Sequence, residues 1–433
     1  MRWRRAINNI FMKKWLLGSE ENAAKNSYIW NLVASGINAL ESVLVLMIAT
    51  RCVSIEAVGI YTIAFSVANL LMCLGKYNVR TFQVTDAKGE YSFGDYLNTR
   101  IITIILMCVA TVFYSGYKYV GGGYSVRKLV IILFIIFLYG TEAFEDVYLS
   151  ELQRIGRLDV GAKMFALRWS LTLIAWGVSL IALKDELIAV LIAAVVDAAA
   201  LCYLIYVVKE LIYLSTDAQR DCNHANVRNL LKACLPLCIS AMLALYLPTA
   251  GRYAIDACLT DADQAYYGFI SMPIFVIDLL TMVVFQPVVK QMAEYWAEGR
   301  YGIFVKNILK FVIILVGISA VMLIGAYFLG IWGLSLLYGV DLSAFRLELM
   351  LLMLGGVAMG FVGLFVTILT IMRRQKFIMC AYGAVSLIMI LSINRIVLLM
   401  GIYGAALYTM AAMAVLAVAL GIGVVAGVKR PKL

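Results

Sequence analysis

Apolar segments of about 20 residues recur along the whole 433-residue chain and are separated by short polar connections. An α-helix needs about 20 mainly apolar residues to cross the hydrocarbon core of a bilayer. The alternating ten-residue pattern that marks a membrane β-strand is missing from the sequence. The pattern therefore predicts an all-α polytopic membrane protein with about twelve transmembrane helices, over 28–50, 58–75, 101–119, 128–149, 161–183, 187–208, 230–250, 267–289, 308–330, 347–371, 377–400 and 402–427.

Composition and charge support a membrane protein and give it an orientation. Hydrophobic residues make up 64% of the chain and charged residues only 14%, against roughly half and a quarter in soluble domains. With twelve spans, most of the 36 lysines and arginines fall on the side shared by both termini. The positive-inside rule places that side in the cytoplasm. The formal net charge of +10 therefore reports topology and does not indicate a nucleic-acid partner.

The spans divide the chain into two halves with a weak internal repeat. We predict a cytoplasmic N-terminal segment (1–27), an N-terminal six-helix lobe (28–215), a C-terminal six-helix lobe (216–428) and a short basic cytoplasmic tail (429–433). Six spans in each lobe give a parallel repeat about an axis along the membrane normal, as found in transporters. Chance similarity between apolar segments is the alternative to this repeat.

The repeat aligns "TRCVSIEAVGIYTIAFSVANLL" with "GRYAIDACLTDADQAYYGFISMPIFVIDLL", so that Arg51 matches Arg252 and Gly59 matches Gly268. Both arginines fall at the outer end of a leading helix. They are either interfacial anchors that reach the headgroups or groups that face each other across a cleft between the lobes. Asp256 follows Arg252 at i,i+4 spacing and is a candidate partner for it.

Polar side chains form a stripe along the first predicted span. Asn31, Ser35, Asn38 and Ser42 are spaced by four, three and four residues, so they share one helical face with Glu41 beside it. Such a face does not point into lipid. Two interpretations stay open, which are interhelical hydrogen bonding and a water-filled substrate cavity.

Further charges fall inside predicted spans, where ionisable groups are costly and usually pair or serve a pathway. We expect them to share one hydrophilic path with acidic residues at the cytoplasmic end of the fourth span. These residues are Arg168, Asp197, Asp278 and Arg395, with Glu142, Glu145 and Asp146 at the mouth.

Several chemistries are disfavoured by the sequence. The nine cysteines lie mostly in spans and form no CxxC pair, so we expect neither disulfides nor a metal site. No GxxxxGK[ST] motif occurs, and the single histidine, His224, lies in a predicted cytoplasmic loop. We therefore expect no cofactor, no catalytic residues and no enzymatic activity.

The matched stretches resemble a known family. An asparagine-bearing first span ending in "TR", followed by "EAVGIYTIAF" and "FQVTD", and the later "PTAGRYAIDACLTDADQAYYGFISMP", are similar to Wzx-type polysaccharide flippases of the MOP (multidrug/oligosaccharidyl-lipid/polysaccharide) exporter superfamily. The resemblance implies a MATE-like fold of two six-helix bundles around a central cavity. It implies alternating-access transfer of an undecaprenyl-diphosphate-linked oligosaccharide from the inner to the outer leaflet of a bacterial plasma membrane, beside glycosyltransferases and a polymerase.

The resemblance also implies roles for residues in the matched stretches, and the cost of a charge inside a span extends such roles to Arg168, Asp197 and Arg395. Arg51, Arg168 and Arg252 would bind the diphosphate through charge-assisted hydrogen bonds. Asn31, Asn38 and Gln286 would meet sugar hydroxyls. A coupling proton or sodium ion would be carried by Glu41, Asp197 or Asp278. Further cavity or gate candidates are Gln83, Asp86, Asp256 and Arg395.

Two other functions compete with this one. An ion-coupled multidrug or small-molecule antiporter would use the same fold and require an intramembrane carboxylate. A membrane-embedded polysaccharide polymerase or ligase would need catalytic groups facing outward, and the short outward loops offer few of them.

Overall fold

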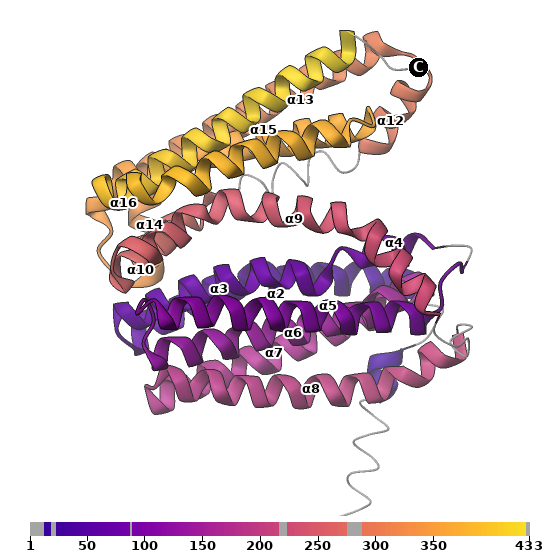
Figure 1. The fold of residues 1–433 in the computed structure, drawn as a ribbon, viewed down its shortest axis with the longest axis horizontal. Coiled ribbons are helices and arrows are strands. Elements are labelled where there is room, and N and C mark those ends of the chain that lie inside the picture. The colour runs from indigo at the N-terminus through magenta and orange to yellow at the C-terminus, as the bar shows by residue number, and fades with distance from the viewer. Residues whose placement is uncertain (1–12, 19–22, 87–88, 216–222, 275–287, 430–433) are drawn as a thin grey trace, which may run out of the picture. The chain divides into compact units, whose positions relative to one another are not determined.

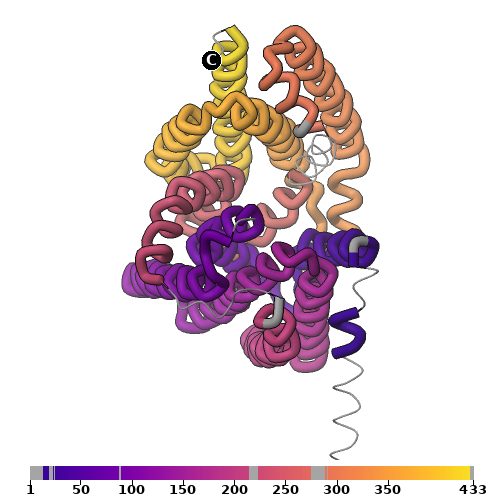
Figure 2. The backbone as a smooth tube through the Cα atoms, turned by 90° about the vertical axis from the view of Figure 1, so that its right-hand side faces the viewer, coloured from indigo at the N-terminus to yellow at the C-terminus, as the bar shows by residue number. Residues whose placement is uncertain are grey.

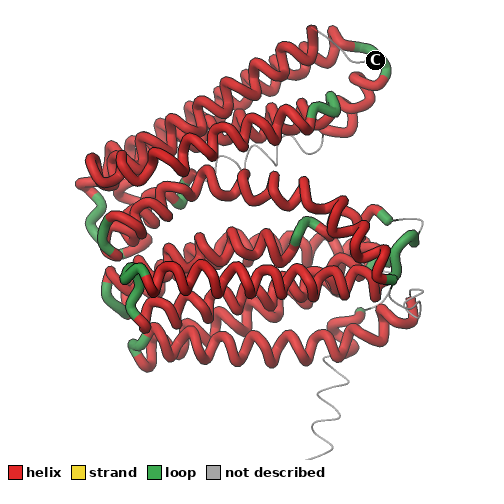
Figure 3. Tube along the Cα trace, viewed as in Figure 1, coloured by secondary structure: helices red, strands yellow, loops and turns green. Residues whose placement is uncertain are grey.

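The computed structural model describes residues 13–18, 23–86, 89–215, 223–274 and 288–429. Throughout these ranges the chain forms helices joined by short turns, with no strand (Figure 3). The all-α class predicted from the sequence is therefore confirmed.

The chain divides into two compact units. Unit 1 comprises Met1–Val53 and Val67–Met242, and unit 2 comprises Ser54–Ser66 and Leu243–Leu433. Helices α3 (Ile55–Lys76) and α9 (His224–Cys258) contribute residues to both. The lobe boundary at residue 216 is a statement about membrane topology and stays a prediction.

Unit 1 is a bundle of long helices that pack side by side (Figure 1). Helix α2 packs along α7 and α7 along α8, while α6 contacts α4, α5, α7 and α8. Figure 2 views these helices, from indigo to magenta, nearly along their axes. Besides parts of α3 and α9, the helices are α2 (Ala23–Cys52), α4 (Val79–Thr85), α5 (Phe93–Val120), α6 (Val126–Arg154), α7 (Leu158–Leu183) and α8 (Glu186–Ser215).

Local sequence signals explain where several helices begin. Helix α5 starts at a capping box, in which the Ser92 hydroxyl accepts from the N–H of Asp95 and the Asp95 carboxylate accepts from the N–H of Ser92. Helix α6 starts at Ser125, whose hydroxyl accepts from the N–H of Lys128. In both cases the cap satisfies backbone donors that have no partner inside the helix.

The most extensive packing in unit 2 is that of α15 (Arg346–Ile371) along α16 (Gln375–Lys429). Gly401, with φ 59° and ψ −142°, interrupts α16 with a backbone conformation that glycine adopts without steric cost. The remaining elements are α10 (Asp261–Ser271), α12 (Val289–Ala297), α13 (Tyr301–Gly325), the π-helical turn η3 (Ala326–Gly330), α14 (Ile331–Tyr338) and η4 (Ser343–Phe345).

Nine helices in the described part of the chain are long and apolar enough to cross a membrane. The predicted spans 377–400 and 402–427 both lie in α16 and are separated by Gly401. The predicted span 128–149 lies in α6, which is absent from the nine and carries several charges. Part of the predicted span 267–289 lies outside the described residues. The count of twelve, the parallel repeat and the cytoplasmic termini therefore stay predictions.

Candidate functional site

A polar cavity of about 200 Å³ lies within unit 1. The stripe predicted on the first span forms one wall of it, with the side chains of Asn31, Ser35 and Asn38. Helices α3, α4, α6 and α7 complete the lining. The full set is Asn31, Ala34, Ser35, Asn38, Lys76, Arg80, Glu142, Leu149, Leu158, Ala162 and Phe165.

The two cations of the cavity wall are each paired with an acid of α6. Lys76 Nζ lies 2.6 Å from Glu142 Oε1, and Arg80 Nη1 lies 3.0 Å from Asp146 Oδ1. Arg80 also donates to Gln153 Oε1 at 2.7 Å. These are charge-assisted hydrogen bonds, which are shorter and stronger than neutral ones. The wall therefore presents cations whose carboxylate partners are already in place.

Asp146 also forms an ion pair with a second arginine. Arg100 of α5 is fully buried, and its Nη2 lies 2.7 Å from Asp146 Oδ2. Its Nη1 donates to the carbonyl oxygen of Gly75 at 2.9 Å. Asp146 thus bridges Arg80 and Arg100 and fixes α6 against α4 and α5.

A second buried cluster surrounds Arg168 of α7. Its Nε lies 2.8 Å from Glu145 Oε2 and its Nη1 lies 2.5 Å from Asp197 Oδ1, and all three side chains are fully buried. The hydroxyls of Thr141 and Thr172 also donate to Asp197, at 2.6 and 2.9 Å. The structure therefore brings together two of the four intramembrane charges predicted to share one path.

Glu41, which lies beside the polar stripe, has a different environment. Its side chain is buried, and Tyr139 donates to its Oε1 at 3.3 Å. Asn69 in turn donates to the Tyr139 hydroxyl at 3.4 Å. Among the described residues, no lysine or arginine lies within ion-pair distance of Glu41, in contrast to Glu142, Glu145 and Asp197.

Gln83 and Asp86 lie near the chain connection between α4 and α5. Gln83 is buried and donates to Glu151 Oε2 at 2.9 Å and to the carbonyl oxygen of Val147 at 3.1 Å. These two hydrogen bonds join α4 to α6, so Gln83 makes a contact between helices. The predicted cavity or gate role of Gln83 stays a prediction.

The carboxylate of Asp86 accepts three hydrogen bonds. They come from the N–H groups of Glu90 and Tyr91, at 2.9 and 3.1 Å, and from the Tyr96 hydroxyl at 3.1 Å. Partial burial raises the pKa of the Asp86 carboxyl, but these donors favour its charged form more strongly, so the pKa is lowered from its ordinary value. The carboxylate closes the turn that follows α4.

In unit 2, Arg252 of α9 is buried, with 6% of its surface exposed. Its Nη1 donates to the Ser66 hydroxyl at 3.2 Å and its Nη2 to the Ser271 hydroxyl at 2.8 Å. No carboxylate of the described residues lies within ion-pair distance, and the suggested partner Asp256 is not among its contacts. Arg252 therefore ties α9 to α3 and α10 inside unit 2.

Close packing of glycines accompanies this contact. A methyl group at Gly268 of α10 would lie 2.6 Å from Thr62 Cγ2, and one at Gly59 would collide with the backbone carbonyl of Asp261. The two glycines that the repeat aligned are thus points where α3 and α10 approach each other closely.

The other predicted site residues are spread more widely. Arg51 and Arg395 are exposed within their own units, and Asp256 is half-buried. Asp278 and Gln286 lie outside the described residues. Whether Arg51 and Arg252 face each other across a cleft stays a prediction, as do the binding roles of all these residues.

Comparison with known proteins identifies the family. A model described as "Polysaccharide biosynthesis protein" matches residues 24–293, which is more than half of the chain. The protein belongs to this polysaccharide biosynthesis family. A search among curated proteins finds no match.

Solved structures confirm the fold. The lipid II flippase MurJ, in an inward closed conformation, is 15% identical with a TM-score of 0.68, covering 93% of this chain and 87% of MurJ. An inward-facing multidrug resistance MATE family transporter of the MOP superfamily is 12% identical with a TM-score of 0.67, covering 92% and 97%. The MATE transporter VcmN of Vibrio cholerae, in its bent form, is 13% identical with a TM-score of 0.56, covering 94% and 98%.

These comparisons confirm the MOP-superfamily resemblance and the MATE-like fold. Family and fold together support a lipid-linked flippase or another MOP transporter, and both are classes of transporter, not of enzyme. The apolar helices and the family likewise support a multi-pass membrane protein. No group of three or more His, Cys, Asp or Glu side chains in the described ranges is arranged to hold a metal ion.

Sequence reasoning missed the basic half of the cavity in this family member. The charge pattern places Lys76, Arg80 and Arg100 in a predicted cytoplasmic connection, although Arg100 is fully buried and the other two line the cavity. A usable signal was present, because acids in the fourth span need cationic partners at the same depth. Tyr139, the donor to Glu41, carried no comparable signal.

Proposed function

We propose that the protein is a flippase that moves a polyprenyl-diphosphate-linked oligosaccharide, a polysaccharide repeat unit, from the inner to the outer leaflet of a bacterial plasma membrane by alternating access. The observation that carries the proposal is the polar cavity of unit 1, which is lined by two amides and a hydroxyl of α2 together with Lys76 and Arg80. Membership of the polysaccharide biosynthesis family supports the class of substrate.

The cavity chemistry suits the two polar parts of such a lipid. Asn31 and Asn38 carry amides that both donate and accept hydrogen bonds, as sugar hydroxyls require. Lys76 and Arg80 carry the donors that bind phosphate oxygens. The diphosphate and glycan would cross the bilayer inside this polar lining, while the hydrocarbon chain stays in lipid. At about 200 Å³ the cavity has room for only part of the headgroup.

The paired acids give the cations a resting partner. An isolated charge at membrane depth is expensive, so Glu142 and Asp146 stabilise Lys76 and Arg80 when the substrate is absent. A diphosphate that arrives would take over donors from these carboxylates. Arg51, Arg168 and Arg252 remain proposed cationic contributors, but Arg168 is already enclosed by two acids.

Glu41 is the proposed coupling group. Asp197 is held by Arg168 and two threonines, whereas the only hydrogen bond to Glu41 from the described residues comes from the neutral Tyr139. A buried carboxyl with a neutral partner can exchange a proton or sodium ion without breaking an ion pair. Asp278 is the third candidate and lies outside the described residues.

The test is a leaflet-accessibility assay in proteoliposomes. A lipid-diphosphate oligosaccharide is placed in one leaflet, and its exposure to an impermeant glycan-modifying reagent is followed with and without the protein. We expect protein-dependent exposure, and Lys76→Gln should slow it by roughly ten- to a hundredfold, since a hydrogen bond to a charged group contributes about 1.5–3 kcal/mol.

Two further variants separate binding from folding. Lys76→Gln combined with Glu142→Gln leaves no unpaired charge and should stay folded but transport-deficient. Arg127→Gln breaks exposed ion pairs to Asp185 and Glu186 outside the cavity and should transport normally. Unchanged transport in the double variant contradicts the role of the cavity. Ion-driven dye efflux without any lipid exposure would instead identify a multidrug antiporter.

A further inference from the structure

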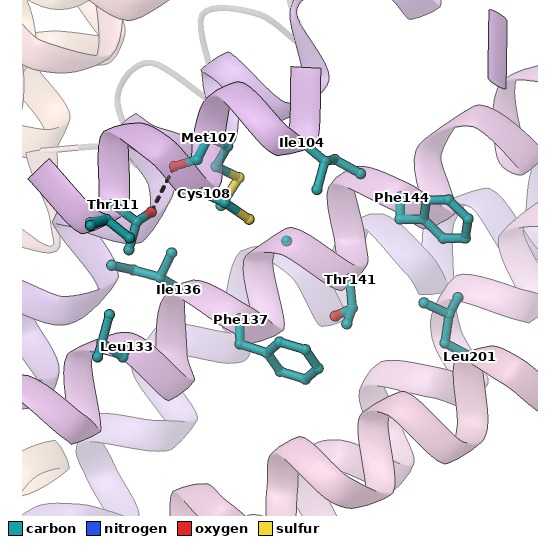
Figure 4. A pocket seen from close by; sticks show the side chains of 12 residues that line it. Ile104, Met107, Cys108, Thr111, Leu133, Ile136, Phe137, Thr141, Phe144 and Leu201 are labelled. Atoms are coloured by element: carbon teal, nitrogen blue, oxygen red, sulfur yellow. Dashed lines mark hydrogen bonds between the residues drawn. The ribbon is translucent and has the colours of Figure 1, made fainter. Parts of the chain in front are cut away.

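A second cavity in unit 1 is apolar and has a volume of about 420 Å³. It lies between α5, α6 and α8, and Figure 4 shows Met107 and Cys108 on one side of an open space and Phe137 and Thr141 on another. The hydroxyl of Thr141 is turned to Asp197, at 2.6 Å, and that of Thr111 bonds to its own helix. Both hydroxyls of the lining are therefore satisfied within the protein, and the rest of the lining is hydrocarbon with the sulfur atoms of Met107 and Cys108.

Two exposed residues of the lining place the mouth of this apolar cavity away from the ends of α5 and α6. Val112 on α5 and Phe137 on α6 line it with 70% and 46% of their surfaces exposed in the described structure. Each lies more than two turns from the ends of its helix. A lipid headgroup at the bilayer surface does not reach this depth, but a hydrocarbon chain does. An empty space here would forfeit dispersion contacts, so a chain from the lipid phase should occupy it.

Helix α6 contributes residues to the lining of both the apolar cavity and the polar cavity. Thr141 lines the apolar cavity, and the next residue, Glu142, lines the polar cavity and binds Lys76. Successive residues point to different faces of a helix that is about 10 Å across. The two cavities therefore lie on different faces of one helix, within reach of a single molecule that has a polar head and a long chain.

We propose that the apolar cavity binds a segment of the polyprenyl chain of the lipid-linked substrate while its diphosphate headgroup occupies the polar cavity. The proposal rests on the proposed function. Bilayer chains are as apolar as the cavity wall, so apolar character alone does not favour one chain over another. Tethering does, because a headgroup held beside Glu142 raises the effective concentration of its own chain at the neighbouring cavity.

The test is photocrosslinking in lipid nanodiscs with two probes at equal mole fraction. One is a polyprenyl diphosphate with a diazirine in its chain, and the other is a phosphatidylglycerol with a diazirine in its acyl chain. Adducts are mapped by peptide mass spectrometry. We expect the prenyl probe to label the α5 and α6 segments that line the cavity, and the phospholipid probe to label exposed helix surfaces without this preference.

Two variants that fill or narrow the apolar cavity, and one control variant outside it, test whether the prenyl chain lies there. Gly140→Phe projects a ring into the cavity, where a Cβ at Gly140 meets only Met107 Cε at 3.9 Å, and Val112→Trp narrows the mouth. Gly116→Phe, on α5 but outside the lining, has nothing within 4 Å of its Cβ and is the control. A cavity filled by the ring, or closed at its mouth, excludes the tethered chain, so prenyl labelling of the lining should fall to the level that the phospholipid probe gives.

The outcomes are distinct from those of the transport assay. Prenyl labelling that is lost in both cavity variants and kept in Gly116→Phe supports the proposal even if no transport is seen. If transport is observed but prenyl labelling is unchanged in Gly140→Phe and Val112→Trp, the proposal is overturned and the proposed function is retained. Cavity-dependent labelling by the phospholipid probe alone also overturns it and assigns the cavity to an ordinary acyl chain.

Discussion

Removing Arg168 should destabilise the protein, and more of the lost stability should come from the unpaired Glu145 than from the unpaired Asp197. The guanidinium is fully buried between Glu145 and Asp197, at 2.8 and 2.5 Å. Arg168→Met keeps most of the side-chain volume and removes the charge. Breaking a buried ion pair in this way costs about 3–5 kcal/mol, because the partners are left as uncompensated charges.

The two carboxylates do not share this penalty equally. Asp197 keeps hydrogen bonds from Thr141 and Thr172, at 2.6 and 2.9 Å. Glu145 keeps none among the described residues, because its Oε2 bonds to Arg168 and its Oε1 has no hydrogen-bond partner. Glu145→Gln in the Arg168→Met background should therefore recover about 1.5–3 kcal/mol, the contribution of a hydrogen bond to a charged group. Asp197→Asn should recover less than half of that.

The free energy of unfolding is measured by SDS titration in mixed micelles, followed by circular dichroism. Arg127→Met is the control, since it breaks exposed ion pairs and should cost less than about 1 kcal/mol. Equal recovery by the two second substitutions, or a larger one from Asp197→Asn, would refute the reasoning from hydrogen-bond partners. A loss at Arg168→Met no greater than the control loss would refute it as well.

Two other predictions concern packing and pH. Gly268→Ala places a methyl group 2.6 Å from Thr62 Cγ2, so it should destabilise the protein by about 1–3 kcal/mol in thermal unfolding, and Thr62→Ala should recover most of this loss; a neutral Gly268→Ala would contradict the close contact. The lowered pKa of Asp86 contributes stability that is present above the unfolded value of about 3.9 and is lost as the pH falls through the folded value. The melting temperatures of wild type and Asp86→Asn, measured from about pH 5 to pH 3, should therefore converge as the pH falls, and parallel curves would argue against this role.

The helices were predictable because a membrane span leaves a strong signal in one dimension. Runs of apolar residues located α3, α7 and α15 to within three residues at both ends, and the gap at residue 401 between two predicted spans coincides with Gly401. The bounds of the two units were harder to predict from the sequence. Residues 54–66 belong with unit 2 because the start of α3 packs on α10, and contacts between segments 200 residues apart leave no periodic signal.

The polar site was predictable only along single helices. Helical spacing placed Asn31, Ser35 and Asn38 on one face, and this face lines a cavity. The partners that give the cavity its charge, Lys76 with Glu142, are 66 residues apart and come from different helices. Spacing within a helix carries no information on such pairs. Arg252 illustrates the same limit, because its contact with Ser66 spans 186 residues.

The pairing of cations with acids has a consequence for any transported anion. A site that releases its ligand on the far side must not bind it too tightly, and a resident carboxylate limits affinity by competing for the same donors. Glu142 and Asp146 occupy this place beside Lys76 and Arg80. The acids lower the free-energy cost of burying the cations when the cavity is empty. When the ligand leaves, the ion pairs between acids and cations form again. In a flippase, binding and release would then be two positions of one exchange between carboxylate and phosphate oxygens.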